Sequence, residues 1–271
     1  MSQTCINIAC GDTYIEGWLN LDYTPHSPSV TRTNLLTRLP FGDANADVVY
    51  SSHFFEHIPR GLVNHFASEC FRILKPGARL RLVLPDLEEM CRSYLVSRGA
   101  GEHAKADFLV LEMLDQCVRM TPGGELGAFY EQLQYFPARN VEMIEFVRQR
   151  TGHQLNPISD TATGRWKRLL TNPVQLLGKL EKLYCEFVLA MLPSAFRHQN
   201  VSLAEVGERH AWIYDFFSVS ELLAQAGFVE IKRVTATTSD ISNFPFFPLD
   251  VTSEGQPRKG LESMYIEALK P

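Results

Sequence analysis

The chain has 271 residues, and its 26 Lys and Arg residues against 31 Asp and Glu residues give a formal net charge of −5. Hydrophobic residues make up 45% and charged residues 21% of it, which is typical of a globular protein and excludes a disordered or fibrous one. The acidic balance disfavours a general nucleic-acid binder. Because the chain shows neither a secretory signal nor an apolar run long enough to span a membrane, we expect a soluble, cytoplasmic protein.

Short apolar runs alternate with turn residues at both ends of the chain. They predict strands at 5–10, 19–23, 30–35, 47–52, 78–85, 229–235 and 263–269. A helical stripe covers 59–74, and a second helix is expected at 218–226, where Ser218 and Glu221 are spaced as a capping box. Strands that alternate with crossovers predict a parallel sheet with covered faces, and therefore an α/β fold.

The middle of the chain has a different pattern. Amphipathic stretches separated by Pro and Gly predict helices near 104–120, 128–150 and 173–192. We therefore expect one α/β domain made of 1–91 and 201–271, interrupted by a helical insertion at 92–200. Such an insertion serves either as a lid over substrate or as an oligomer contact.

The turn after the first predicted strand carries the strongest functional signal. It reads Asn-Ile-Ala-Cys-Gly-Asp over 7–12, and Asp22 ends the next strand. Small residues let a ligand approach the backbone closely, and a carboxylate at the tip of the second strand can accept the hydroxyls of a ribose. Only eleven positions separate Gly11 from Asp22, too few for a pyrophosphate-binding helix, which disfavours a dinucleotide.

Three long segments carry a family resemblance: INIACGDTYIEGWLNLD, LPFGDANADVVYSSHFFEHI and ECFRILKPGARLRLVLPDLE. With RHAWIYDFFSVSELLAQAGF and ESMYIEALKP near the end, the chain resembles a class I S-adenosylmethionine (SAM) dependent methyltransferase. Within that class it resembles the bacterial group whose first motif reads L-N-L-G-C-G-x-x-x-x-x-G-W-x-N-x-D. The resemblance covers 5–92 and about 207–271. It implies SAM as the cofactor and a Rossmann-like, doubly wound, mostly parallel seven-stranded sheet with a helical insertion.

The resemblance also implies which residues contact the cofactor. Ala9, Cys10 and Gly11 would line its methionine and ribose side, and Asp22 would bind the ribose hydroxyls. Asn34 and Leu35 would lie beside the adenine, and Ser51, Ser52 and His53 would flank the methionyl part. Two positions depart from the group: Ala9 stands for a glycine, and Asn34 stands for an aspartate.

Residues 53–57 read His-Phe-Phe-Glu-His, which matches the H-x-x-E-H motif of one class of zinc proteases. That chemistry requires the motif on a helix, whereas here it directly follows a strand, so we do not interpret it as a protease site. Some SAM enzymes that act on quinone precursors or small RNAs carry E-x-x-E-H at this place and bind a divalent metal there. Because His53 replaces the first glutamate, we assign no metal ligand from the sequence, and metal binding stays an alternative.

Three side chains are candidate general bases for a methyl transfer. His57 comes first, because imidazole titrates near neutral pH, and His210 and Asp86 follow. Trp212 and Tyr214 are expected to pack against the acceptor, or else to be core aromatics. A base is required only if the acceptor is a hydroxyl or a protonated amine.

The sequence thus predicts methyl transfer from SAM to a small molecule or to a glycan acceptor, most simply on oxygen. The glycan, and with it polysaccharide biosynthesis, follows from the resemblance alone. The alternatives are a SAM-fold scaffold protein without catalysis and an RNA methyltransferase. The basic cluster at 165–168 and the amphipathic stretch up to 192 suggest a peripheral membrane contact through 165–192. The oligomeric state is left open.

Overall fold

The computed structural model describes residues 3–156, 184–185, 187–204 and 207–271. Its strands are β1 Cys5–Ile8, β2 Leu19–Asp22, β3 Val30–Arg32, β4 Ala46–Ser52, β5 Leu74–Pro85, β6 Val229–Val234 and β7 Ser263–Leu269. Its α-helices are α1 Arg60–Ile73, α2 Leu87–Gly99, α3 His103–Val118, α4 Gly124–Tyr135, α5 Val141–Thr151, α7 Ser194–Asn200, α8 Phe216–Gln225 and α9 Phe246–Leu249. The described residues also form the 3-10 helices η1 Phe55–His57 and η2 Pro137–Arg139.

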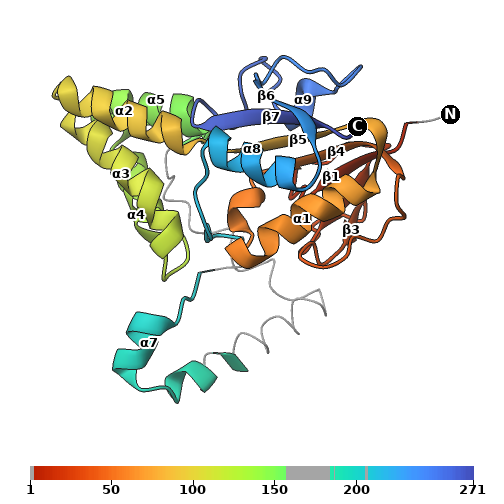
Figure 1. The fold of residues 1–271 in the computed structure, drawn as a ribbon. Helices are drawn as coiled ribbons and strands as arrows, with labels where there is room; N and C mark the ends of the chain where they lie inside the picture. Colours follow the sequence, from red (N-terminus) through yellow and green to blue (C-terminus); the bar gives the residue numbers. More distant parts are fainter. Residues whose placement is uncertain (1–2, 157–183, 186, 205–206) are drawn as a thin grey trace.

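Within the described residues, the strands form one seven-stranded sheet in the order β3-β2-β1-β4-β5-β7-β6 (Figure 1). Neighbouring strands run parallel from β3 to β5, whereas β7 is antiparallel to both β5 and β6. The predicted Rossmann-like, mostly parallel seven-stranded sheet is therefore confirmed. The chain order reverses between β1 and β4, and in open α/β sheets ligands bind at the carboxyl ends of the strands at such a point.

The two faces of the sheet are covered differently. Helices α1 and α8 lie over one face (Figure 1), where Phe66, Cys70 and Leu223 pack with Ile6 and Leu82 of the strands. The other face packs against the segment 236–251, which is mostly loop and includes α9. Successive strand residues alternate between the two faces, so the sheet is apolar on both sides.

One fully buried arginine anchors the loop-covered face. Arg81 of β5 pairs with Asp250 at 2.7 Å and with Glu267 of β7 at 2.6 Å, and none of the three side chains is exposed. The guanidinium also donates to the backbone carbonyls of Thr235 and Thr238. These bonds tie the loop to the centre of the sheet.

Helices α2 to α5 form a separate group beside the sheet (Figure 1). They enclose their own apolar cluster, made of Phe108, Leu126, Leu133 and Val147. The predicted helix at 128–150 is wrong in one respect, because Pro137 begins η2 and separates α4 from α5. Helix α2 was not predicted.

The start of α8 also differs from the prediction. The helix begins at Phe216, and Asp215, not Ser218, is its N-cap. The Asp215 carboxylate accepts a hydrogen bond from the backbone N–H of Ser218 at 2.8 Å, and the Ser218 hydroxyl accepts one from the backbone N–H of Asp215. Ser218 is therefore the far partner of the capping box, and Glu221 takes no part in it.

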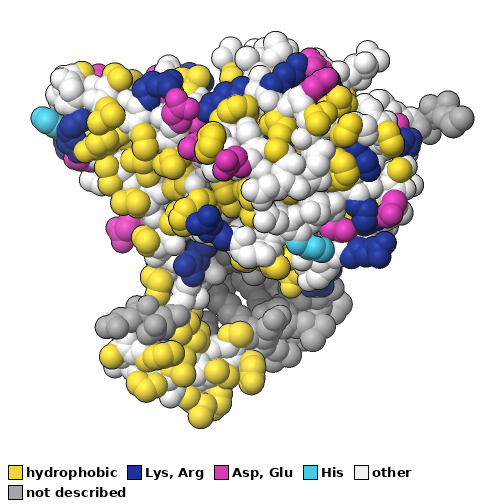
Figure 2. Space-filling view, in the orientation of Figure 1, with side chains coloured by type: hydrophobic (Ala, Val, Ile, Leu, Met, Phe, Trp, Pro, Cys, Tyr) yellow, Lys and Arg dark blue, Asp and Glu magenta, His cyan; other side chains and the backbone are white. Residues whose placement is uncertain are grey.

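Among the described residues, no helix has both the length and the apolar content needed to cross a membrane. The basic cluster at 165–168 and most of the predicted stretch 173–192 lie outside the described residues. The described residues from 184 onward expose the large apolar side chains of Tyr184, Phe187, Met191 and Phe196. These apolar side chains gather on the part of the molecule that includes α7 (Figure 2).

Candidate functional site

A cavity of about 330 Å³ opens at the carboxyl ends of β1 and β4, where the strand order reverses. Five of the predicted cofactor residues line it: Ala9, Cys10, Gly11, Ser52 and His53. Ala9, Cys10 and Gly11 belong to the loop after β1, Ser52 ends β4, and His53 directly follows it.

The turn after β1 is held by the carboxylate of Asp22. One carboxylate oxygen accepts from the backbone N–H of Gly11 at 2.9 Å, and the other accepts from that of Thr24 at 2.8 Å. Ala9 and Gly11 both adopt positive φ, +56° and +51°. Each Asp22 oxygen keeps a free lone pair, because a carboxylate has about four acceptor sites. The turn therefore presents a fixed acceptor pair at the tip of β2.

Asp22 and the remaining predicted cofactor residues lie outside the cavity lining. Asn34 is exposed, and its side-chain oxygen accepts from the backbone N–H of Leu36 at 3.1 Å. Leu35 is buried in the main apolar cluster. Ser51 is buried in β4, and its hydroxyl has no hydrogen-bond partner among the described residues. Their contacts with a cofactor stay predictions.

Two cations that line the cavity were not predicted. Arg258 and Lys259 precede β7 and line the cavity together with Asp12. Burial lowers the pKa of Lys259, and the positive charge of Arg258 adds to the effect. Within the described part of the chain, the Lys259 ammonium forms no ion pair and no hydrogen bond. The Arg-Lys-Gly sequence before the last strand was the only signal for this pair.

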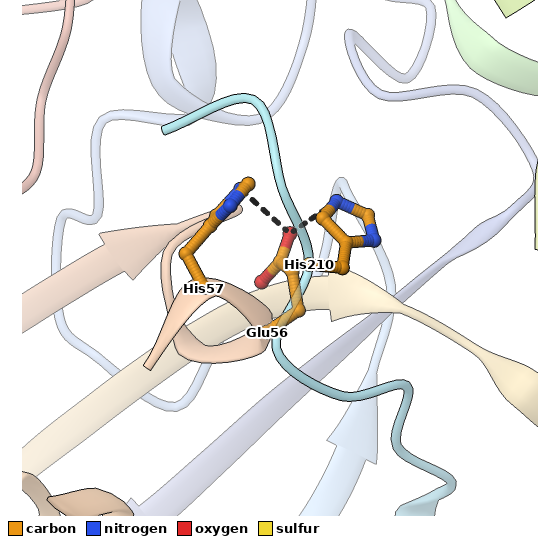
Figure 3. A group of neighbouring side chains, drawn as sticks. All are labelled: Glu56, His57 and His210. Atoms are coloured by element: carbon orange, nitrogen blue, oxygen red, sulfur yellow. Dashed lines mark ion pairs between the residues drawn. The ribbon is translucent and has the colours of Figure 1, made fainter. Parts of the chain in front are cut away.

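A second group of polar side chains lies next to the cavity. Figure 3 shows His57 and His210 on either side of the Glu56 carboxylate, with both rings directed toward it. Oε1 of Glu56 is 3.9 Å from Nε2 of His57 and 4.0 Å from Nε2 of His210. The two predicted histidines therefore meet, although 153 positions separate them in the sequence.

Backbone contacts bring these residues together. The carbonyl of Glu56 accepts from the N–H groups of Ala211 at 2.7 Å and Trp212 at 3.2 Å. Nδ1 of His57 donates to the carbonyl of Arg209 at 2.8 Å. The segment 209–212 is thereby fixed against η1.

The charge state of this group follows from its burial. Burial lowers the pKa of His57 and lowers that of His210 to about 3, so both rings are neutral at physiological pH. Burial raises the pKa of Glu56 to about 8. Neither carboxylate oxygen of Glu56 has a hydrogen-bond partner among the described residues, and the residue is only 1% exposed.

His53 connects the cavity with this group. Its ring lines the cavity, its Nε2 is 2.9 Å from the Ser263 hydroxyl, and its Nδ1 is 3.3 Å from Oε1 of Glu56. Burial lowers the pKa of His53 well below the usual range, so its ring is neutral too. Its backbone adopts φ +50° where β4 ends.

The structure places Asp86 apart from the cavity and the histidines. Its carboxylate caps α2 by accepting from the backbone N–H of Glu88, and it pairs with Arg233. It lines a different cavity, of about 540 Å³, with Glu88, Arg92 and Arg233 among its neighbours.

The two predicted acceptor aromatics also lie elsewhere. Trp212 and Tyr214 line a cavity of about 280 Å³ near α1 and α8. The Arg60 guanidinium is 4.1 Å from the centre of the Trp212 ring, and Tyr214 is buried against Phe55. For Tyr214 the alternative of a core aromatic fits these contacts.

Residues 20–82, less than a quarter of the chain, match the family model described as a methyltransferase domain. The matched stretch runs from β2 through β5 and includes Asp22, His53, Glu56 and His57. It agrees with the resemblance to class I SAM-dependent methyltransferases and with SAM as the cofactor, and it supports methyltransferase activity. Among curated proteins, none matches the chain significantly.

Solved structures of methyltransferases are similar to the chain at low identity. A SAM-dependent methyltransferase from Thermotoga maritima has 13% identity and a TM-score of 0.42, over 100% of this chain and 83% of that one. One from Archaeoglobus fulgidus has 11% identity and a TM-score of 0.40, over 99% and 86%. A Haloferax volcanii protein in complex with the methyltransferase activator Trm112 has 13% identity and a TM-score of 0.37, over 99% and 83%. At these scores the similarities carry no conclusion about acceptor or partner.

Proposed function

We propose that this chain, whose residues 20–82 match a methyltransferase domain, transfers a methyl group from SAM to a small-molecule or glycan acceptor, on oxygen. The observation that carries the proposal is the turn after β1, whose backbone is held by Asp22 at the reversal point of the sheet. This arrangement suits a nucleoside whose ribose hydroxyls meet a carboxylate.

The residues around the cavity fit such a cofactor. Ala9, Cys10 and Gly11 offer small side chains and a close backbone, and Asp22 offers two oriented acceptors. The ammonium of Lys259 is a suitable partner for the methionine carboxylate, since it has no other anion within bonding distance among the described residues. Burial raises the pKa of the Cys10 thiol to about 12, so Cys10 serves as a small lining residue and not as a nucleophile.

When bound, SAM supplies a methyl group on a positively charged sulfur. Transfer is an in-line displacement, so the chain contributes mainly by holding the acceptor in position. An oxygen acceptor must also lose its proton. We propose that His57, and after it His210, accept this proton from beside His53, because both rings are neutral and the bond from His57 Nδ1 to the Arg209 carbonyl leaves Nε2 of His57 free to accept. Asp86 is not part of the proposal, since Arg233 and the end of α2 occupy its carboxylate.

The domain organisation, the class of acceptor and a membrane contact are also proposals. We keep the helical insertion 92–200 as a unit distinct from the domain of 1–91 and 201–271, in line with its separate apolar cluster, while the first helix of its group, α2, already begins at Leu87. The net charge of −5 favours a small or glycan acceptor over RNA. A peripheral membrane contact through 165–192 is supported by the exposed aromatic side chains of Tyr184 and Phe187.

The first experiment is thermal unfolding of the full chain alone and with SAM, S-adenosylhomocysteine or NAD. A ligand at about 100 times its Kd stabilises the folded state by about 2.7 kcal/mol. We expect the two adenosyl sulfur compounds to raise the midpoint and NAD to leave it unchanged. Asp22→Ala should lose the response, whereas Asp107→Ala, which removes an exposed carboxylate on α3, should keep it.

Two results would contradict the proposal. If neither adenosyl compound shifts the midpoint of the wild-type chain, it does not use SAM. If SAM binds but no hydroxylated small molecule or glycan becomes methylated, the chain is a SAM-fold scaffold without catalysis. Methylated RNA as the product would instead identify the RNA methyltransferase alternative.

A further inference from the structure

Glu56 places an ionisable carboxyl group in the interior of the protein. Its side chain is 1% exposed, and neither of its oxygens accepts a hydrogen bond from any described residue. Lys259 lies near enough to act on it electrostatically, but the two form no ion pair. A buried carboxylate without a partner is costly, and such groups are normally paired or bound to a metal ion.

One nitrogen of His57 and one of His210 face this carboxyl group. Because a carbonyl can only accept, the bond from His57 to Arg209 places the ring hydrogen on Nδ1 and leaves the lone pair of Nε2 free. That Nε2 faces Glu56, and Nε2 of His210 faces it from the other side (Figure 3). The donor atoms of all three residues lie within 4.8 Å of one another.

We propose that Glu56, His57 and His210 form a binding site for a divalent transition-metal ion, with zinc as the representative ion. The bond from His57 Nδ1 to a backbone carbonyl is the outer contact that fixes a metal-binding imidazole in the correct tautomer. Two imidazoles and one carboxylate form a donor set found at zinc sites that keep an open position. Magnesium and calcium are disfavoured, because they prefer oxygen ligands.

The distances require only a small contraction. Metal–ligand bonds of about 2.0–2.1 Å in a tetrahedron place neighbouring donors about 3.3 Å apart. The Glu56 oxygen is 3.9 Å and 4.0 Å from the two nitrogens, which is about 0.6–0.7 Å more than this spacing, and all three donor atoms lie within 4.8 Å of one another, so side-chain rotations would bring them around one ion. The backbone bonds between Glu56 and 211–212 keep the two elements together during this adjustment.

The site lies beside the cofactor cavity, because His53 contacts Glu56 on one side and lines the cavity on the other. An ion there would occupy the Nε2 lone pairs of both histidines and lower the pKa of a coordinated acceptor hydroxyl, so the ion would replace the histidines in the proton step. That consequence rests on the proposed function, whereas the binding of the ion does not.

The test measures metal binding by the full chain without SAM or an acceptor. The chain is stripped with a chelator, loaded with Zn²⁺ or Mg²⁺, passed through a desalting column and analysed for metal content. We expect wild type to retain one Zn²⁺ per chain and no Mg²⁺. Glu56→Gln and His210→Gln should retain none, while His65→Gln, which changes an exposed histidine on α1, should match wild type.

A second measurement controls for folding. Metal-free Glu56→Gln should unfold at or above the midpoint of metal-free wild type, because the unpartnered ionisable carboxyl group is gone, and Zn²⁺ should raise the midpoint of wild type only. Wild type that retains no zinc, or Glu56→Gln that retains as much as wild type, would overturn the site. So would a metal-free Glu56→Gln that unfolds below wild type, since the carboxylate would then have a protein partner. All these readouts remain valid if no methyl transfer is found.

Discussion

Two residues at the cavity have backbones in the left-handed region although neither is a glycine. Ala9 follows β1 with φ +56°, and His53 follows β4 with φ +50°. This conformation costs an ordinary residue about 1–2 kcal/mol. Such residues persist where the surroundings fix them, and they gather at ligand sites. Ala9 stands where the related motif has a glycine, and its positive φ is a conformation that a glycine adopts without steric cost.

Replacing Ala9 with glycine should stabilise the chain. Glycine removes the cost of positive φ but adds entropy to the unfolded state, so we expect a net gain of about 0.5–1 kcal/mol. Urea unfolding measures it. Ala44→Gly is the matched control, because Ala44 is exposed and has φ +51°. A gain at Ala44 together with a loss at Ala9 would show that the Ala9 methyl group provides packing that outweighs its strain.

Lys259→Met should weaken the binding of SAM and S-adenosylhomocysteine. A hydrogen bond to a charged group contributes about 1.5–3 kcal/mol, which corresponds to a loss of about 10- to 100-fold in affinity. The affinity for 5′-methylthioadenosine, which lacks the methionine carboxylate, should not change. Calorimetry compares the ligands, with Lys232→Met, a surface lysine paired with Asp240, as the control. An equal loss for all three ligands would contradict a carboxylate contact.

The sequence predicts those site residues that are close together along the chain. The turn at 9–11 and its carboxylate at Asp22 are separated by one short loop, so composition and spacing already join them. The sequence predicts His210 as a candidate base but not its contact with Glu56. That contact depends on backbone hydrogen bonds from Ala211 and Trp212 to Glu56, which lie far apart in the sequence. Arg258 and Lys259 were not predicted, because only the docking of their loop turns an ordinary basic pair toward the cavity.

At the scale of elements, too, the sequence predicts one part of the structure and misses another. The central strands β1, β4, β5 and β7 were predicted because their apolar runs are buried in the sheet, whereas the predicted edge strand β6 is mostly exposed. Helix α2 was not, because Leu95 and Val96 are exposed and only Met90 and Ser97 are buried, so no apolar stripe marks it. Its N-cap, Asp86 followed by Glu88, was the available signal.

A junction of backbone contacts joins α5 to the loop before β7. The N–H groups of Leu261 and Glu262 donate to the carbonyls of Gln149 and Arg150 at 3.1 and 3.0 Å. Gly260 permits this approach, because a Cβ there would lie 2.1 Å from the Arg150 carbonyl oxygen.

Gly260→Ala should therefore be strongly destabilising. Gly255→Ala is the matched control: it has a similar positive φ, +75° against +65°, but nothing within 4 Å of its added Cβ. We expect Gly260→Ala to cost at least about 2 kcal/mol more than Gly255→Ala, because only the former displaces backbone. Urea unfolding of both variants gives the difference. Equal losses of unfolding free energy in the two variants would mean that the backbone contacts around Gly260 can shift without a free-energy cost.

At the scale of the whole molecule, buried charges hold the separate parts together. Arg81, with Asp250 and Glu267, fixes the loop-covered face of the sheet. Arg150, with Glu112 at 2.6 Å, lies where the helical group meets the last strand. Glu262 lies beside this second pair, and burial together with the Glu112 carboxylate raises its pKa well above the usual range.

This raised pKa makes the attachment of the helical group sensitive to pH. The folded chain binds the Glu262 proton more tightly than the unfolded chain, whose glutamates titrate near about 4.3. The stability from that proton is complete below the unfolded pKa and is lost as pH rises toward the folded one.

Glu262→Gln cannot titrate, so its free energy of unfolding should fall less than that of wild type between about pH 5 and pH 8. Urea unfolding across this range measures both slopes. Glu254→Gln, an exposed change in the preceding loop, should run parallel to wild type. A Glu262→Gln curve parallel to wild type would show that Glu262 stays ionised in the folded chain, with Arg150 outweighing both its burial and Glu112.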